Sequence, residues 1–130
     1  MPQADRNAVL RGKRILVVED EPFIALELAE IVVELGGSLA GSVAQIADAL
    51  VLIEAGSVDA AVLDVNLGLE KIDPVADALA AQGCPFVFTT GYGRVGVPGA
   101  HNDRVVVEKP FSRAEIATAL ATEIGRFNRQ

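Results

Sequence analysis

The stretch Ile15-Leu16-Val17-Val18-Glu19-Asp20 passes from an apolar run directly into two acids. Three later segments share this design, a short β-type apolar run that leads to a polar residue: Ala61-Val62-Leu63 before Asp64, Phe86-Val87-Phe88-Thr89 before Thr90, and Val105-Val106-Val107-Glu108 before Lys109. Such near-continuous apolar runs are typical of strands covered on both faces of a parallel sheet. The carboxyl ends of parallel strands share one edge, where such folds bind ligands. The sequence therefore predicts that these polar groups converge on one pocket.

Helix-like segments alternate with the strand-like runs, which predicts an α/β fold with a five-stranded parallel sheet. The predicted strands cover residues 14–19, 38–43, 59–64, 85–90 and 104–107. The first helix begins at Pro22 and stops at Gly36-Gly37, and a second runs over 45–55. In the third, Asp73 is the predicted N-cap and Pro74 the first helical residue. The last helix opens with a capping box made by Ser112 and Glu115.

The connection at residues 91–103 contains four glycines and a proline where a crossover helix should stand. In a helix interior, each glycine costs about 1 kcal/mol and a proline about 3 kcal/mol. We therefore expect at most a short, frayed or 3₁₀-like helix there, as a mobile element beside the pocket. His101 lies in this segment without a second histidine or cysteine nearby, so we expect a surface loop residue and not a metal ligand.

Bulk properties exclude several classes of protein. The chain of 130 residues fits one domain, with residues 1–12 as a flexible N-terminal lead-in and 13–130 as the folded unit. A net charge of −7 argues against nonspecific nucleic-acid binding. The sequence shows no signal-peptide pattern and no apolar run of about 18 residues, so we expect no membrane contact and a cytoplasmic protein. Cys84 is the sole cysteine, which rules out an intramolecular disulfide and predicts a small buried hydrophobe.

The three acids Glu19, Asp20 and Asp64 would repel one another at close range unless a cation intervened. Mg²⁺, or another divalent cation, prefers such oxygen ligands. The alternative is that the acids near residue 20 merely precede a helix, whose N-terminus favours negative charge. Asp64 favours the metal site, because an aspartate that ends an apolar strand is costly unless something pairs with it.

A carboxylate such as Asp64 can also attack a phosphoryl group and hold it as an acyl phosphate. The group would bring about −1.5 to −2 charges, which a divalent cation and Lys109 could balance, while the Thr90 hydroxyl could donate a hydrogen bond. Each residue taken alone has a simpler interpretation: a solvated lysine, or a threonine that happens to end a strand.

Together these segments resemble the receiver domain of two-component response regulators, over about residues 13–128. The matching pieces are Val17-Val18-Glu19-Asp20-Glu21-Pro22, Leu63-Asp64-Val65-Asn66-Leu67, Thr90-Gly91 and Lys109-Pro110-Phe111. The resemblance implies a flavodoxin-like (βα)₅ fold with strand order 2-1-3-4-5. It also implies that Asp64 is the phosphoacceptor, which takes its phosphoryl group from the phosphohistidine of a histidine kinase or phosphotransferase.

The resemblance assigns roles to the remaining residues as well. Asp20 would bind Mg²⁺ directly together with Asp64, Glu19 would act mostly through water, and Asn66 would offer its backbone carbonyl. Thr90 would be the switch hydroxyl, Gly91 would touch the phosphoryl group through its N–H, and Lys109 would pair with that group. The Lys109-Pro110 bond would be cis.

One position departs from the usual pattern. Receivers commonly carry Tyr or Phe three residues before the lysine, and this chain has Val106. The segment 85–93 instead resembles the Pro-Phe-x-Phe-Ala-Thr-Gly-x motif of the "FAT GUY" receivers of alphaproteobacteria, with Thr89 in place of Ala. Those are often stand-alone regulators, several of them tied to general stress signalling. Tyr92 either takes over part of the switch role or covers the mouth of the site.

The predicted function is that of a signalling receiver and not of an enzyme: phosphorylation changes contacts of the region 91–111 with a kinase or a downstream signalling protein. A phosphate sink, or a receiver cut from a hybrid histidine kinase, is the alternative. A flavodoxin-like electron carrier would need a phosphate-cradling loop, but residues 20–22 are acidic. A phosphatase of the haloacid dehalogenase type would need a second Asp where Asn66 stands.

Overall fold

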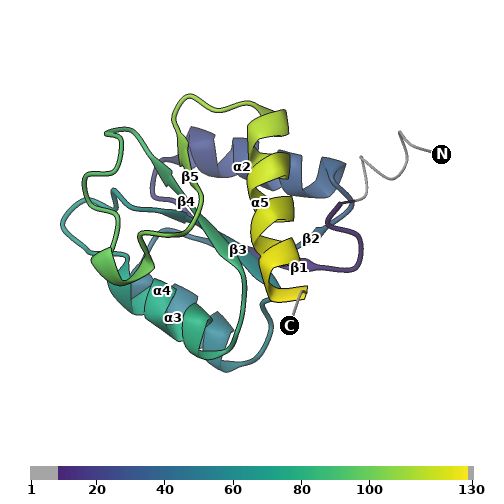
Figure 1. The fold of residues 1–130 in the computed structure, drawn as a ribbon, viewed down its shortest axis with the longest axis horizontal. Helices are drawn as coiled ribbons and strands as arrows, with labels where there is room; N and C mark the ends of the chain where they lie inside the picture. Colours follow the sequence, from purple (N-terminus) through teal and green to yellow (C-terminus); the bar gives the residue numbers. More distant parts are fainter. Residues whose placement is uncertain (1–8, 129–130) are drawn as a thin grey trace.

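A five-stranded parallel sheet lies between two layers of helices (Figure 1). The computed structural model describes residues 9–128. The strands are β1 (Arg14–Val18), β2 (Ser38–Val43), β3 (Ala60–Asp64), β4 (Phe86–Thr90) and β5 (Val106–Glu108). Their order is β2-β1-β3-β4-β5, which confirms the predicted topology.

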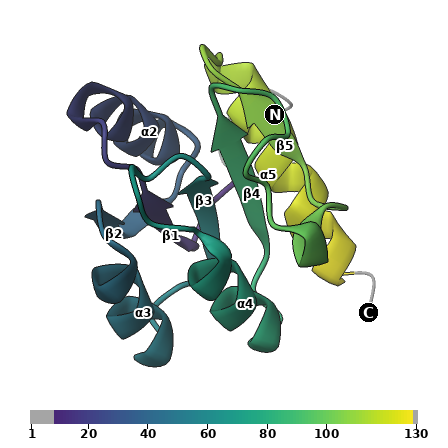
Figure 2. The same cartoon turned by 90° about the vertical axis from the view of Figure 1, so that its left-hand side faces the viewer.

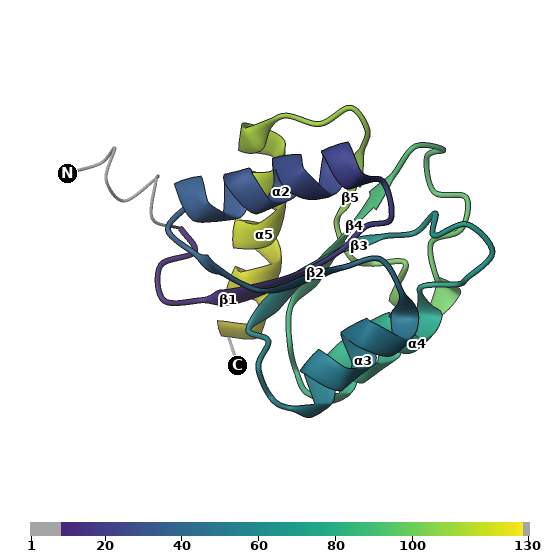
Figure 3. The ribbon, with the colours of Figure 1, turned by 180° about the vertical axis from the view of Figure 1, so that it is seen from behind.

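The helices are α2 (Pro22–Glu34), α3 (Ile46–Glu54), α4 (Asp73–Ala81) and α5 (Arg113–Asn128). Helices α2 and α5 cover one face of the sheet, and α3 and α4 cover the other (Figures 2 and 3). The core is divided in the same way. Apolar side chains of the sheet point alternately to the two layers, so that Leu63 and Phe88 pack in the α3/α4 layer, whereas Val62 and Val87 pack in the α2/α5 layer.

Local sequence signals account for most helix boundaries. The capping box at α5 is confirmed: Ser112 N–H donates to Glu115 Oε1 at 2.8 Å, and Glu115 N–H donates to Ser112 Oγ at 3.1 Å. The prediction that Asp73 caps α4 is wrong. Ile72 is the N-cap without a side-chain cap bond, and Asp73 is already helical. Ile72 is buried, so core packing fixes this start, while Asp73 places a negative charge in the first turn, where the helix dipole favours it.

The connection from β4 to β5 contains one short 3₁₀ helix, Gly99–His101, as predicted from its glycines and proline. His101, however, is not a surface loop residue. Its side chain is buried, its Nε2 lies 2.7 Å from Asp77 Oδ1 on α4, and its ring packs edge-on against Phe86 with 5.5 Å between the ring centroids. No sequence signal predicts this pairing, because Asp77 belongs to another helix, 24 residues earlier in the chain.

The N-terminal segment joins the domain sooner than predicted. Residues 1–8 of the predicted lead-in lie outside the described part of the chain. Leu10 is fully buried, and its N–H donates to Leu35 O at 2.9 Å, so this part of the predicted lead-in packs on the domain.

Two further expectations concern Cys84 and membrane contact. Cys84 is buried, as predicted. Within residues 9–128, no helix has the length and apolar character needed to span a membrane.

Candidate functional site

The ends of β1 and β3 bring three carboxylates together. Asp64, the last residue of β3, is 1% exposed, and Glu19, directly after β1, is 3% exposed, whereas Asp20 faces solvent. One oxygen from each of these residues lies within 4.8 Å of the others. The convergence predicted from the strand ends is therefore present.

Lys109 completes this cluster from the far edge of the sheet. Its Nζ lies 2.9 Å from Glu19 Oε1 and 3.4 Å from Asp64 Oδ1, and its side chain is 18% exposed. Its backbone N–H donates to Thr90 O at 2.8 Å, and the Lys109-Pro110 peptide is cis, as predicted. Lys109 is thus a partly buried ion-pair partner and not the solvated lysine of the simpler interpretation.

Burial and neighbouring charges shift the pKa values of Glu19 and Lys109. Burial, followed by the hydrogen bond to Asp64, raises the pKa of Glu19 to about 7, although the contacts with Lys109 and the Glu21 N–H oppose this shift. Burial acts to lower the pKa of Lys109, but its hydrogen bond to Glu19 and the charges of Asp64 and Glu19 outweigh it and raise that pKa. Three acids beside one ammonium leave an excess of negative charge.

Thr90 and Gly91 are held by the Asn66 side chain. Thr90 Oγ1 donates to Asn66 Oδ1 at 3.3 Å, and Gly91 N–H donates to the same oxygen at 3.3 Å. Thr90 Oγ1 in turn accepts the Tyr92 N–H at 3.0 Å, while Asn66 N–H donates to Asp64 Oδ1 at 2.9 Å. The two donors that the resemblance assigns to a phosphoryl group are therefore paired with an amide oxygen in this structure.

These groups surround a cleft of about 320 Å³. It is lined by Glu19, Asp20, Glu21, Ile24, Asp64, Asn66, Gly91, Tyr92 and Lys109. Ile24 and Glu21 were not predicted as site residues. Glu21 could have been predicted, because it directly follows the acid pair Glu19-Asp20. Tyr92 is 72% exposed and lies at this cleft, while Val106 packs against the α3/α4 core.

The donor set suits a hard divalent cation. All three acids offer oxygen, and their excess negative charge would be offset by such an ion. The same cleft places the Asp64 carboxylate near the Lys109 ammonium and the Thr90 hydroxyl. These groups can accept a phosphoryl group, offset its negative charge and donate a hydrogen bond to it.

Comparison with known proteins identifies the family. No model of a known protein family matches the chain. The receiver (REC) domain of the PhyR response regulator from Erythrobacter litoralis is 27% identical, with a TM-score of 0.77, over 88% of this chain and 92% of that one. SdrG from Sphingomonas melonis Fr1 is 46% identical, with a TM-score of 0.78, over 89% of this chain and 98% of that one. This chain belongs to the response regulator receiver family. Receivers act in two-component signalling, and the acidic cluster fits a phosphoacceptor site.

A curated relative is longer than this receiver. The transcriptional regulatory protein PdtaR of Mycobacterium tuberculosis is 26% identical over 130 residues, which span 97% of this chain but 63% of PdtaR. The electron-carrier alternative finds no support among these relatives.

Proposed function

We propose that Asp64 accepts a phosphoryl group from the phosphohistidine of a histidine kinase or phosphotransferase in the cytoplasm. The observation that carries this proposal is the placement of a buried Asp64 carboxylate 3.4 Å from the Lys109 ammonium, within the cluster of acids. An Asp64 oxygen attacks phosphorus, the P–N bond to the donor imidazole breaks, and the imidazole leaves with the electron pair.

Asp20, Asp64 and the backbone carbonyl of Asn66 would hold the divalent cation, and Glu19 would act on it mostly through water. Mg²⁺ would neutralise charge on the transferred group. Lys109 supplies the second positive charge, so it must turn from Glu19 toward the phosphoryl oxygens. This movement leaves the buried Glu19 carboxylate without the ammonium that lies 2.9 Å away in this structure. Phosphorylation of Asp64 would therefore also change the surroundings of Glu19.

Thr90 and Gly91 would supply the hydrogen bonds of the switch. To reach the phosphoryl group, both must release Asn66 Oδ1. Because the following segment 91–103 contains only one short 3₁₀ helix, it can adjust with little loss of regular structure. We propose that residues 91–111 change their protein contacts in consequence, with the kinase or with a downstream signalling protein. PhyR, a relative, is described as a stress response regulator, and we propose a similar setting for this receiver.

The test is phosphorylation by acetyl phosphate with Mg²⁺, followed by intact-mass measurement. The wild type should gain one phosphoryl group and Asp64→Asn none. Asp48→Asn, which changes an exposed aspartate on α3, is the matched control and should behave as wild type. A phosphorylated Asp64→Asn protein would refute the assignment.

A phosphate sink is the second candidate within this function. Affinity capture of partners with and without beryllofluoride separates the two. A partner that binds only the beryllofluoride-loaded protein supports an output switch, whereas rapid loss of phosphate with no such partner supports a sink.

A further inference from the structure

Thr89 presents a buried hydroxyl that has no hydrogen-bond partner among residues 9–128. The residue is fully buried in β4, and its Oγ1 is unpaired. Its backbone carbonyl is paired in the ladder, where Thr89 O accepts the Val65 N–H at 3.0 Å. An unpaired buried hydroxyl destabilises a fold, and the motif that this segment resembles has an alanine here, which would avoid the problem.

Strand register places this hydroxyl next to the phosphoacceptor candidate. Thr89 pairs with Asp64 on one side and with Val107 on the other. Paired residues of neighbouring parallel strands lie about 4.8 Å apart and point to the same face. This face is the α2/α5 side, because Val62, Val87 and Val107 pack there. Thr90, one residue later, points to the opposite side.

The path of the Lys109 side chain passes the same point. Lys109 directly follows β5, and β4 separates β5 from β3. Since Lys109 Nζ nevertheless comes within 3.4 Å of Asp64 Oδ1, the side chain crosses β4 near its carboxyl end. Lys109 comes two residues after Val107, so side-chain alternation places it on the same α2/α5 face of the sheet. On this face, the β4 residue in register with Asp64 is Thr89. An ammonium has three N–H donors, and the contacts with Glu19 and Asp64 account for two of them.

We infer that Thr89 is a positioning residue for Lys109, an inference that rests on the proposed function. The Thr89 hydroxyl accepts a hydrogen bond from the Lys109 ammonium once that ammonium leaves Glu19 for the phosphoryl group on Asp64. The hydroxyl is unpaired before phosphorylation and paired after it. The missing hydrogen bond therefore destabilises the unphosphorylated conformation relative to the phosphorylated one, and so shifts the equilibrium between the two.

The test compares Thr89→Val, which keeps the shape and removes the hydroxyl, with Thr89→Ser, which keeps the hydroxyl. Two quantities are measured: the melting temperature of the metal-free protein, and the affinity for beryllofluoride in the presence of Mg²⁺ by calorimetry. Thr89→Val should melt higher than wild type and bind beryllofluoride about tenfold more weakly, the effect expected of one hydrogen bond to a charged group. Thr89→Ser should retain the wild-type affinity, and Thr118→Val, at an exposed site on α5, should change neither quantity.

A merely structural role gives a different result. If Thr89→Val binds beryllofluoride as tightly as wild type, or if Thr89→Ser loses affinity as much as Thr89→Val, the inference is wrong. Failure of the proposed function is distinguishable, because the wild type itself would then neither bind beryllofluoride nor take phosphate from acetyl phosphate.

Discussion

The ammonium of Lys109 lies 2.9 Å from Glu19 Oε1, closer than its 3.4 Å approach to Asp64 Oδ1. The proposed nucleophile is thus the more distant of the two carboxylates that share this cation. In the absence of metal, Lys109 occupies the position of a counterion for the cluster. A divalent cation and Lys109 then compete for the same negative charge, since like charges at short range repel.

Removal of this ammonium should strengthen metal binding. We expect Lys109→Met to bind Mg²⁺ roughly tenfold more tightly than wild type, because one positive charge next to the acids is lost while the methylene stem is kept. Isothermal titration calorimetry measures the change. Arg113→Met removes an exposed arginine that pairs with Glu34 at 3.6 Å, and it should leave the Mg²⁺ affinity unchanged. An unchanged or weaker affinity in Lys109→Met would show that the two cations do not compete.

Glu19 should make stability depend on pH in the absence of metal. Its pKa rises from an ordinary value of 4.5 to about 7 in the fold. Between these values the folded protein holds a proton that the unfolded chain has released, so the free energy of unfolding falls as pH rises through this window. The stability that Glu19 contributes is present in full below the unfolded pKa and is lost once pH passes about 7.

The variant Glu19→Gln isolates this effect, because glutamine has a similar shape and does not ionise. Unfolding is followed with urea in EDTA buffers between pH 5 and 8. As pH rises from 5 to 8, the wild type should lose stability relative to Glu19→Gln. The loss in its free energy of unfolding should be on the order of 2 kcal/mol. If the free energies of unfolding of the two proteins changed with pH in parallel, the raised pKa of Glu19 would be contradicted.

The predictable features of this molecule follow from parallel topology or from local backbone signals. Polar residues at the ends of apolar runs predicted the meeting of Asp64 with Asp20 and Lys109, because parallel topology fixes which strand ends share an edge. The Ser112 capping box and the glycines of residues 91–103 were equally informative, since each acts on its own backbone.

Other features depend on partners that the sequence does not reveal. His101 finds Asp77, and Thr90 finds Asn66, only after the chain has folded. The N-cap of α4 shifted by one residue because the burial of Ile72 outweighs the capping preference of Asp73. In each case a contact between distant segments decides the outcome, and no periodicity or propensity encodes it.

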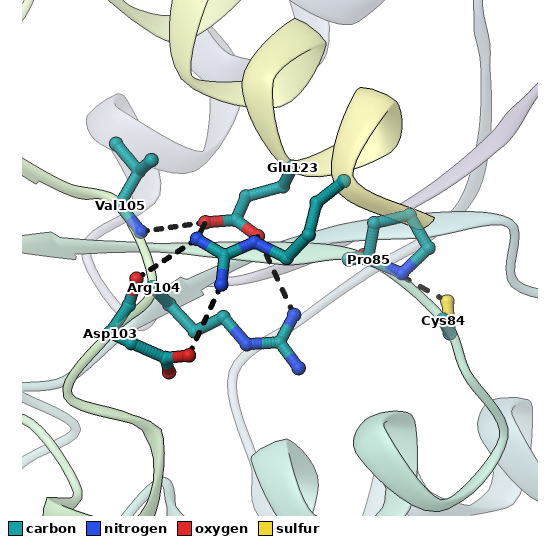
Figure 4. A network of polar contacts seen from close by, with 7 residues as sticks. Cys84, Pro85, Asp103, Arg104, Val105 and Glu123 are labelled. Carbon is teal, nitrogen blue, oxygen red and sulfur yellow. Dashed lines mark hydrogen bonds and ion pairs between the residues drawn. The ribbon is translucent and has the colours of Figure 1, made fainter. Parts of the chain in front are cut away.

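Glu123 is the clearest example of such a contact, and it leads to the last prediction. It is fully buried on α5, and it connects the helix to Val105, directly before β5 (Figure 4). Its Oε2 accepts the Val105 N–H at 2.8 Å, and its Oε1 lies 3.0 Å from Arg126 Nε and 3.5 Å from Arg104 Nη1.

Loss of this carboxylate should destabilise the fold without altering the phosphorylation site. Glu123→Ala leaves the partly buried Val105 N–H without this acceptor, and it removes an ion-pair partner of Arg104, whose guanidinium lies 4.3 Å from the centre of the Phe86 ring. Removal of one partner of a buried ion pair costs about 3 to 5 kcal/mol, which urea unfolding would detect as a lower midpoint. Glu30→Ala, at an exposed position on α2, should cost far less. If Glu123→Ala unfolded at the same urea concentration as Glu30→Ala, the network would contribute only conformational specificity, and the segment 103–105 would be held to α5 by apolar packing alone.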